Sequence, residues 1–171
     1  MFQIAPEIPD DLYEVENLYD LTFAPGRTAL SSYRLRTGVA SLVELSLVAR
    51  DKYGSVSGAI RYWPVWVGDA AVLLLGPVAV HPTRQGEGLG NMLIAQSLTR
   101  ARKLGWSRVI LVGDEPYYHR FGFRRTIAEN LRFPQPTNPE RVLGCALVEG
   151  AFDEVSGVVE NWLTKNEPPN Y

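Results

Sequence analysis

The stretch of sequence that decides the fold is AVLLLGPVAVHPTRQGEGLG, residues 71–90. Its apolar first half, which ends at Val80, predicts a strand at the centre of a sheet with both faces covered. Pro77 lies in this strand and has no N–H to offer a neighbour, so we expect a bulge or a local parting there. The second half predicts a bend and then a glycine-rich helix start. Such a start favours an anion site, because glycine lets successive backbone N–H groups turn toward one ligand at the positive end of a helix.

The residues around this stretch extend the pattern. A helix over residues 88–104 has cations in its last turns and Gly105 as its stop, and residues 108–112 return as a strand. A strand, a helix and a strand in this order predict two parallel strands. A further strand over residues 56–67 contains Pro64, which requires an edge position or a bulge. The remaining expected elements are helices over residues 11–23, 28–36 and 116–122, strands over 42–50, 142–148 and 155–162, and a loop over 133–139.

The composition is that of one globular domain over residues 1–171. Of the 171 residues, 46% are hydrophobic and 21% charged, so the chain can bury a core of its own. A formal net charge of -2 without a basic tract argues against nucleic acid as a partner. Cys145 is the only cysteine, which excludes a disulfide within the chain and fits a reducing compartment. Residues 1–9 lack the pattern of a secretory signal, and the longest apolar run is shorter than the ~20 residues of a spanning helix, so we expect a cytoplasmic protein without a membrane partner.

Glycine spacing alone leaves the ligand of the anion site open. A nicotinamide-dinucleotide site would use Gly86 and Gly88, with an acid such as Asp114 after the next strand. Its glycines follow the first strand directly, however, whereas five residues separate Val80 from Gly86 here, and Asn91 occupies the position of the third glycine. A Walker loop requires Gly-Lys-Ser or Gly-Lys-Thr, which the stretch lacks.

Three motifs in order narrow the choice. They are Val78-Ala79-Val80-His81-Pro82, Gln85-x-x-Gly88-x-Gly90 and Tyr118-x-x-x-Gly122-Phe123. In this arrangement the chain resembles the GNAT superfamily of acyl-CoA-dependent N-acyltransferases. The resemblance implies an α/β (α+β) fold with a single mixed, mostly antiparallel sheet, a central pair of parallel strands that splay apart, and helices on both faces. In that family, acyl-CoA enters where the two parallel strands part.

The resemblance also implies how acetyl-CoA, or another acyl-CoA, binds as co-substrate, with no metal. The amides of the pantetheine arm would pair with backbone groups at the end of the central strand, which are those of Val78, Ala79 and Val80. Backbone amides of the glycine loop would hold the pyrophosphate with help from Asn91; the loop comprises Gln85, Gly86, Glu87, Gly88, Leu89 and Gly90. Arg84 beside it is a candidate for a further phosphate contact or, equally, a solvated charge.

Tyr118 matches the tyrosine that, in this family, protonates the departing CoA thiolate. A hydroxyl with a pKa of ~10 can donate to a sulfur whose thiol has a pKa of ~8.5 as charge develops on it. The alternatives are a packing role for Tyr118 and assignment of the acid to its neighbour Tyr117. An acceptor amine must lose a proton before or during attack, but no base is singled out among the candidates, which are Glu44, Asp114, Glu115 and His119.

The sequence therefore predicts an N-acetyltransferase that passes an acyl group from acyl-CoA directly to the amine of a small molecule or a peptide. Tyr62, Trp63 and Trp66 are candidates for the acceptor pocket or for the core, and loops near residues 24–40 and 130–140 would shape that pocket. The alternatives are an acyl-CoA-binding sensor or regulatory module without efficient turnover, and a nicotinamide-nucleotide protein. The acceptor, the acyl preference and the choice between monomer and homodimer stay open.

Overall fold

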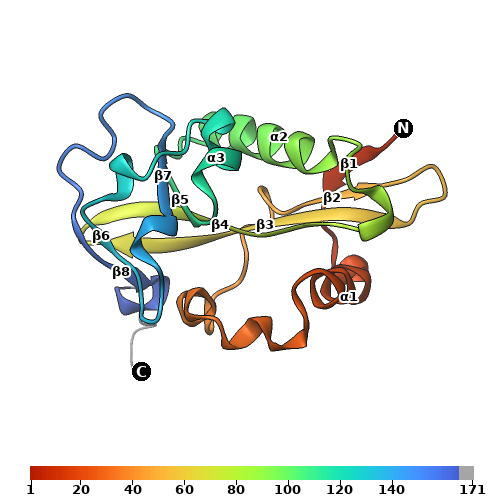
Figure 1. Ribbon diagram of the computed structural model, residues 1–171, viewed down its shortest axis with the longest axis horizontal. Helices are drawn as coiled ribbons and strands as arrows, with labels where there is room; N and C mark the ends of the chain where they lie inside the picture. Colours follow the sequence, from red (N-terminus) through yellow and green to blue (C-terminus); the bar gives the residue numbers. More distant parts are fainter. Residues whose placement is uncertain (166–171) are drawn as a thin grey trace, which may run out of the picture. The chain divides into compact units, whose positions relative to one another are not determined.

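The computed structural model describes residues 1–165, in which the strands form a mixed, mostly antiparallel sheet (Figure 1). The strand order is β1-β2-β3-β4-β5-β7, and β8 pairs with both β3 and β6. The strands are β1 (Gln3–Pro6), β2 (Leu47–Arg50), β3 (Val56–Val67), β4 (Ala70–Val80), β5 (Arg108–Val112), β6 (Leu131–Arg132), β7 (Val142–Ala146) and β8 (Gly157–Asn161). The helices are α1 (Leu12–Phe23), α2 (Leu89–Lys103) and α3 (Glu115–Tyr118). No helix in the described residues has the length and hydrophobicity needed to cross a membrane.

The parallel pair at the centre of the sheet is formed by β4 and β5. Leu73 pairs with Val109 and Leu74 with Ile110, and both pairs precede Pro77 in β4. On its other side, β5 pairs with β7 in the antiparallel direction along its whole length. The predicted fold class is therefore confirmed, with α2 as the connection between the two parallel strands.

Pro64 lies between two stretches of β3 that have different partners. β2 pairs with β3 from Val56 to Ile60, and β8 pairs with it from Val65 to Val67. Pro64 falls between these stretches, so its missing N–H interrupts the pairing with neither strand. β3 thus accommodates Pro64 at the point where its partner strand changes from β2 to β8.

The described chain divides into two compact units. The first unit comprises Met1–Ala29, Leu42–Tyr62 and Leu75–Gly105, and the second comprises Leu30–Ser41, Trp63–Leu74 and the described chain from Trp106 onward. β3 and β4 each contribute one end to the first unit and the other end to the second. The single domain over residues 1–171 stays a prediction.

In the first unit, α1 and α2 lie on opposite faces of the strands (Figure 1). One face of α1 packs Val15, Leu18 and Tyr19 against buried strand side chains, which are Val48, Val56, Ala59 and Ala79. α2 approaches β3 closely because the strand has a glycine beneath it. A Cβ at Gly58 would lie 3.0 Å from Leu93 Cδ1 and 3.2 Å from Leu89 Cδ2. The buried apolar faces of the two helices stabilise this unit.

The second unit has an apolar core of its own. Most of its buried members come from the strands and from the loop after β6, and they include Val65, Val72, Leu74, Ile110, Phe133, Val142 and Val159. Beside this core, Trp66 of β3 stacks on Trp162 with ring centroids 4.3 Å apart. The Trp66 indole N–H also donates to the Trp162 carbonyl oxygen at 3.0 Å. These contacts tie the end of β8 to β3.

Some local predictions are wrong. β2 begins at Leu47 and not at residue 42, because residues 42–46 form a turn in which the Ser46 N–H and hydroxyl both donate to the Leu42 carbonyl. The helix predicted over residues 28–36 is instead made of two 3-10 segments, Pro25–Ala29 and Ser31–Arg36. The strands β1 and β6 have no counterpart in the sequence prediction. Each is short and is held by a partner far along the chain, which local propensity does not record.

Candidate functional site

The glycine loop between β4 and α2 owes its path to two glycines in the left-handed region. Gly86 has a φ of 85°, and Gly88, which immediately precedes α2, has a φ of 79°. Other residues rarely adopt these angles, although nothing lies within 4 Å of where a Cβ would be. These positions therefore need glycine for the backbone conformation, and not because a side chain would clash. The exposed members of the loop are Gln85, Gly86, Glu87 and Gly88.

Backbone N–H groups at the start of α2 are oriented toward the loop. Leu89 and Gly90 lie in the first turn, where an N–H has no acceptor within the helix, and Gly88 offers no side chain to cap them. Leu89 is buried and anchors this turn on β3 beside Gly58. Asn91 follows in the same turn and is partly buried. An anion in front of the turn would meet these N–H groups and the positive end of a 15-residue helix.

Arg84 at the edge of the loop forms an ion pair with Asp51. Its guanidinium donates to Asp51 Oδ2 at 3.0 Å and lies 5.8 Å from the centroid of the Phe2 ring. Desolvation acts to raise the pKa of the Asp51 carboxyl, but two backbone N–H groups and the Arg84 cation outweigh it and lower that pKa. Any phosphate contact of Arg84 would thus have a carboxylate beside it, which repels an anion.

The end of β4 is oriented by a tyrosine of α1 that the sequence analysis missed. The hydroxyl of the fully buried Tyr19 donates to the Pro77 carbonyl oxygen at 3.2 Å. In a trans peptide the carbonyl of one residue and the N–H of the next point in opposite directions, so the Val78 N–H points away from Tyr19. Ala79 is buried, whereas Val78 and Val80 are partly exposed. In the sequence, the only sign of Tyr19 is its place on the apolar face of a predicted helix.

Tyr118 ends α3 and has its ring among aromatic side chains of the second unit. The Tyr117 ring meets it edge-on with centroids 4.9 Å apart, and the buried Phe123 ring does so at 5.9 Å. Gly122, with a φ of 95°, ends the 3-10 turn that follows, as the motif predicts. Burial, helped by the nearby Tyr117 and Asp114, raises the pKa of Tyr118 to about 12. The hydroxyl therefore keeps its proton throughout the neutral range.

The raised pKa of Tyr118 predicts a titration that can be measured without substrate. We expect the tyrosinate absorbance of wild type and Tyr118→Phe to coincide up to about pH 10, where ordinary tyrosines ionise. The two curves should separate by one tyrosine only as the pH approaches about 12. A separation centred near pH ~10 would show that Tyr118 ionises like an exposed tyrosine.

The candidate bases do not share a buried position. Glu44, Asp114 and His119 are exposed, and Glu115 is partly exposed. Asp114 also pairs with Arg141 at 3.4 Å. The described residues therefore single out no general base.

Of the three aromatic side chains considered for an acceptor pocket, Tyr62 belongs to the core. It is fully buried, and its hydroxyl is 2.8 Å from the hydroxyl oxygen of Ser97 on α2. Trp63 lies on the second unit's core, with the Arg36 guanidinium 5.7 Å from its ring centroid. Trp66 is covered by Trp162 in the stack described above.

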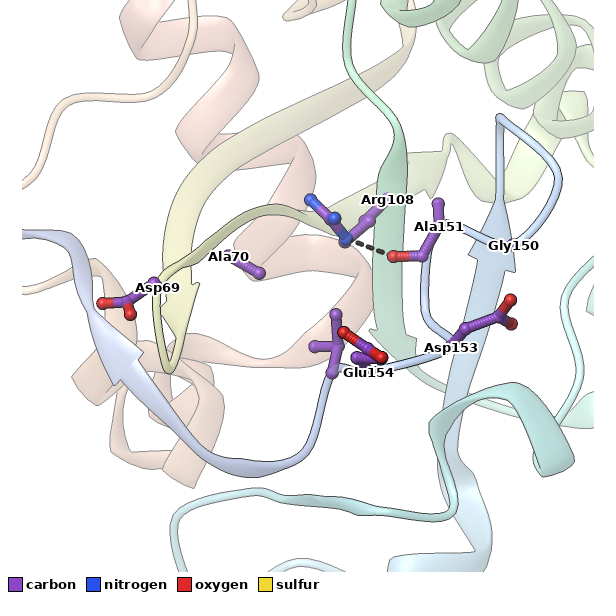
Figure 2. A pocket seen from close by; sticks show the side chains of 8 residues that line it. Asp69, Ala70, Arg108, Gly150, Ala151, Asp153 and Glu154 are labelled. Atoms are coloured by element: carbon purple, nitrogen blue, oxygen red, sulfur yellow. Dashed lines mark hydrogen bonds between the residues drawn. The ribbon is translucent and has the colours of Figure 1, made fainter.

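Figure 2 shows a polar pocket in the second unit that none of the motif residues lines. Its lining residues are Asp69, Ala70, Arg108, Gly150, Ala151, Asp153, Glu154 and Val155. Arg108 Nε donates to the Ala151 carbonyl oxygen at 2.5 Å, which holds this cation on the pocket wall. A hydrogen bond from Lys165 lowers the pKa of the Asp69 carboxyl. Within residues 1–165, no three His, Cys, Asp or Glu side chains gather in a way that could hold a metal ion.

Comparison with known proteins decides the family. The model of the Acetyltransferase (GNAT) family matches residues 12–123, which include the glycine loop and Tyr118. The chain belongs to the GNAT acetyltransferase family. Its family-level activity is therefore acyl transfer, and all three motifs of the sequence lie within the matched residues.

Relatives match this GNAT protein over nearly its whole length. The Escherichia coli strain K12 protein named "Uncharacterized N-acetyltransferase YhbS" is 30% identical over 165 residues, covering 92% of this chain and 94% of the relative. A crystal structure of Escherichia coli YhbS in complex with CoA has a TM-score of 0.81 at 29% identity, covering 96% of this chain and 92% of that one. A GNAT family acetyltransferase from Brucella melitensis, in complex with acetyl-CoA, has a TM-score of 0.70 at 30% identity, covering 94% and 95%.

Proposed function

We propose that this GNAT protein is an N-acetyltransferase that passes the acetyl group of acetyl-CoA directly to the amine of a small-molecule or peptide acceptor. The observation that carries the proposal is the Tyr118 hydroxyl, which is neutral and partly buried at the position where the GNAT motif has its acid. Tyr118 would protonate the departing thiolate. The cytoplasmic location stays a prediction.

Acetyl-CoA as the donor is supported by the glycine loop and by the two solved relatives that contain CoA and acetyl-CoA. The pantetheine arm would exchange hydrogen bonds with the backbone of residues 78–80 at the end of β4. The pyrophosphate would lie against backbone N–H groups of residues 85–91, at the positive end of α2. Because Arg84 is paired with Asp51, we assign the phosphates to backbone groups and not to this side chain.

The proposed reaction moves one proton from nitrogen to sulfur. The neutral amine attacks the thioester carbonyl carbon, a C–N bond forms, and the carbonyl oxygen of the tetrahedral intermediate carries the negative charge. A backbone N–H near Val80 would stabilise this oxyanion, and removing comparable donors elsewhere costs about 3–4 kcal/mol. The C–S bond then breaks and the Tyr118 hydroxyl protonates the sulfur. The proton released by the nitrogen restores the hydroxyl.

Acetyl-CoA consumption with a panel of amines tests the proposal. We expect free CoA to accumulate with at least one amine, in equal amount to an N-acetylated product, and not in the reaction without amine. Tight CoA binding without turnover on any amine would instead support an acyl-CoA sensor. Protection of the fold against heat by NAD, with none by CoA, would support a nicotinamide-nucleotide protein.

Gly88→Ala should weaken the binding of CoA and leave the binding of pantetheine, which has no pyrophosphate, unchanged. Alanine at a φ of 79° is strained by about 1–2 kcal/mol, so the loop relaxes and its N–H groups turn from the phosphates. This corresponds to about a 5–30-fold rise in Kd, measurable by calorimetry.

The matched control for Gly88→Ala is Gly105→Ala, at the end of α2 opposite to the glycine loop. Gly105 has a φ of 90°, and nothing lies within 4 Å of its Cβ position, so the same strain arises away from the glycine loop. We expect Gly105→Ala to bind CoA like wild type. Equal losses of CoA and pantetheine affinity in Gly88→Ala would argue against a pyrophosphate site at the loop.

A further inference from the structure

The Tyr118 ring occupies the space beside the backbone of Gly113, the residue that follows β5. A Cβ at Gly113 would lie 2.5 Å from Tyr118 Cε2, and 3.0 Å from both Tyr118 Cδ2 and Leu111 Cδ1. Carbon atoms in favourable contact are about 3.5–4.0 Å apart. The φ of Gly113 lies outside the left-handed region, so alanine fits the backbone conformation. The need for glycine at this position is therefore steric, and the group it makes room for is the Tyr118 ring.

The neighbours of the Tyr118 ring limit how it can move away from a Cβ at Gly113. The Gly113 N–H donates to the Arg141 carbonyl oxygen at 2.9 Å, which fixes the backbone on one side of the ring. The rings of Tyr117 and of the fully buried Phe123 meet Tyr118 edge-on from other sides. A Cβ at Gly113 would therefore displace the ring, and with it the hydroxyl, by about 1 Å to restore an ordinary contact.

We propose that Gly113 is a positioning residue, which sets the place of the Tyr118 hydroxyl by leaving the ring a slot against the backbone. The inference rests on the proposed role of Tyr118 as the acid. A general acid works only within hydrogen-bond reach of the atom that it protonates, and a misplacement of about 1 Å can cost on the order of 100-fold in rate. Gly113 has no side chain that could bind a substrate or carry a proton, so we assign its effect on turnover to the placement of Tyr118.

The test is a double-mutant cycle with Gly113→Ala and Tyr118→Phe. We expect Gly113→Ala to lower kcat by about 10–100-fold and to change the KM for acetyl-CoA by less than about threefold. In the Tyr118→Phe background, which has no hydroxyl to misplace, the same alanine should lower kcat by less than about twofold. An equal fold-loss in both backgrounds, or wild-type kcat in Gly113→Ala, overturns the inference.

Gly144→Ala is the matched control within the second unit. A Cβ at Gly144 on β7 would lie 2.8 Å from Ile127 Cγ2, so the substitution also crowds the interior, but against a side chain other than Tyr118. We expect Gly144→Ala to lower the Tm and keep the wild-type kcat. A fall of kcat equal to that of Gly113→Ala would show that crowding in this unit is enough, and would overturn the positioning role.

Two measurements decide the positioning role independently of catalysis. In Gly113→Ala, movement of the ring out of the slot beside Gly113 should reduce its burial and so lower the pKa of Tyr118 from about 12 toward ~10 in the tyrosinate titration. The Tm loss caused by Gly113→Ala should also shrink in a Tyr118→Ala background, where the slot is empty. An unchanged titration together with an equal Tm loss overturns the inference, even if Tyr118→Phe alone keeps full turnover and the acid role fails.

Discussion

Tyr118→Phe should lower kcat by about 10²–10⁴-fold, the range that general acids contribute, and leave the Kd for CoA nearly unchanged. The substitution removes one oxygen and keeps the ring that packs against Phe123. The lost interaction is one that forms only as charge develops on sulfur, so it acts on the transition state and not on the bound donor. Initial rates at saturating acetyl-CoA and calorimetric titration with CoA measure the two quantities. Wild-type kcat in Tyr118→Phe would remove the hydroxyl from the mechanism.

The pH dependence of kcat/KM in wild type should show no loss from the ionisation of Tyr118 between pH 7 and about 10. Because Tyr118 acts in its neutral form and has its pKa raised to about 12, its contribution persists at lower pH and is lost only as the pH rises through that value. Between pH 7 and about 10 we expect kcat/KM to rise with the deprotonation of an acceptor amine whose pKa is ~10.4. Tyr118→Phe should therefore lower the whole profile without changing its shape in this range.

Tyr117→Phe is the control that separates the two adjacent tyrosines. Tyr117 packs edge-on against Phe121, and the Arg120 guanidinium lies 4.9 Å from its ring centroid. The Tyr117→Phe variant keeps both ring contacts and the ring that packs on Tyr118, and burial, the main cause of the raised pKa of Tyr118, is unchanged. We expect its kcat to stay within about threefold of wild type. A loss as large as that of Tyr118→Phe would assign the acid to Tyr117.

Residues 71–112 show why so much of the fold can be predicted from the sequence. An apolar strand, a glycine-rich bend and a helix with a clear stop each follow from local chemistry, and the order of the three leaves little choice of topology. The same locality explains why a glycine-rich bend is predicted before the helix, whereas the binding of CoA by this loop stays a prediction. Gly86 and Gly88 do adopt the left-handed angles that favour glycine.

The supporting contacts of the candidate site could not be predicted, because they join residues that are distant in the sequence or depend on a side chain's exact direction. Tyr19 is 58 residues from Pro77, whose carbonyl accepts its hydrogen bond. Gly113 is only five positions from Tyr118, but its contact depends on how the ring is turned. The strand prediction over residues 42–46 is wrong for another reason. The side chains there follow a strand-like pattern, but the hydrogen bonds that Ser46 donates to the Leu42 carbonyl close a turn.

A second large effect is expected in the buried charge network of the first unit. Arg61 on β3 donates from Nε and Nη2 to the two carboxylate oxygens of Glu7, at 3.0 and 2.7 Å, and from Nη1 to Glu16 at 2.5 Å. The side chains of Arg61 and Glu7 are only 9% and 12% exposed. Arg27 donates to the same Glu16 carboxylate and to Asp20. The Arg61–Glu7 pair thus has little contact with water, and the link from β3 to α1 runs through Glu16, whose side chain is 39% exposed.

Arg61→Met should lower the free energy of unfolding by about 3–5 kcal/mol at neutral pH, as measured by urea denaturation. Methionine fills part of the volume of the aliphatic stem, so the main loss is electrostatic. It leaves the Glu7 carboxylate buried without the cation that binds both of its oxygens, and such an uncompensated charge is more costly than the pair itself. The Tyr19 ring, whose centroid is 5.2 Å from the Arg61 guanidinium carbon, also loses a neighbour.

The stability loss in Arg61→Met should narrow as the pH falls. Burial acts to raise the pKa of Glu16, but hydrogen bonds from Arg61 and Arg27 and their charges outweigh it and hold this pKa below its usual value of 4.5. In wild type the resulting stabilisation is complete above 4.5 and is lost as the pH falls through the lowered pKa. Arg61→Met lacks much of the stabilisation from Glu16 already at neutral pH, so its free energy of unfolding falls less than that of wild type as Glu16 is protonated. The unfolding free energies of the two proteins should therefore converge in acid.

The control for Arg61→Met is Lys165→Met, which breaks an ion pair at the surface. Lys165 Nζ lies 2.5 Å from Asp69 Oδ1, and the Asp69 side chain is fully exposed, so water replaces the lost partner. We expect this variant to lose far less stability than Arg61→Met at neutral pH, because a surface ion pair exchanges its partner for water. The double variant Arg61→Met, Glu7→Met has no Glu7 carboxylate that could be left buried without a cation. It should therefore recover much of the stability that Arg61→Met alone loses. If the double variant is instead less stable than Arg61→Met by the full cost of Glu7→Met alone, the two side chains act independently, and the buried pair is not the source of the loss.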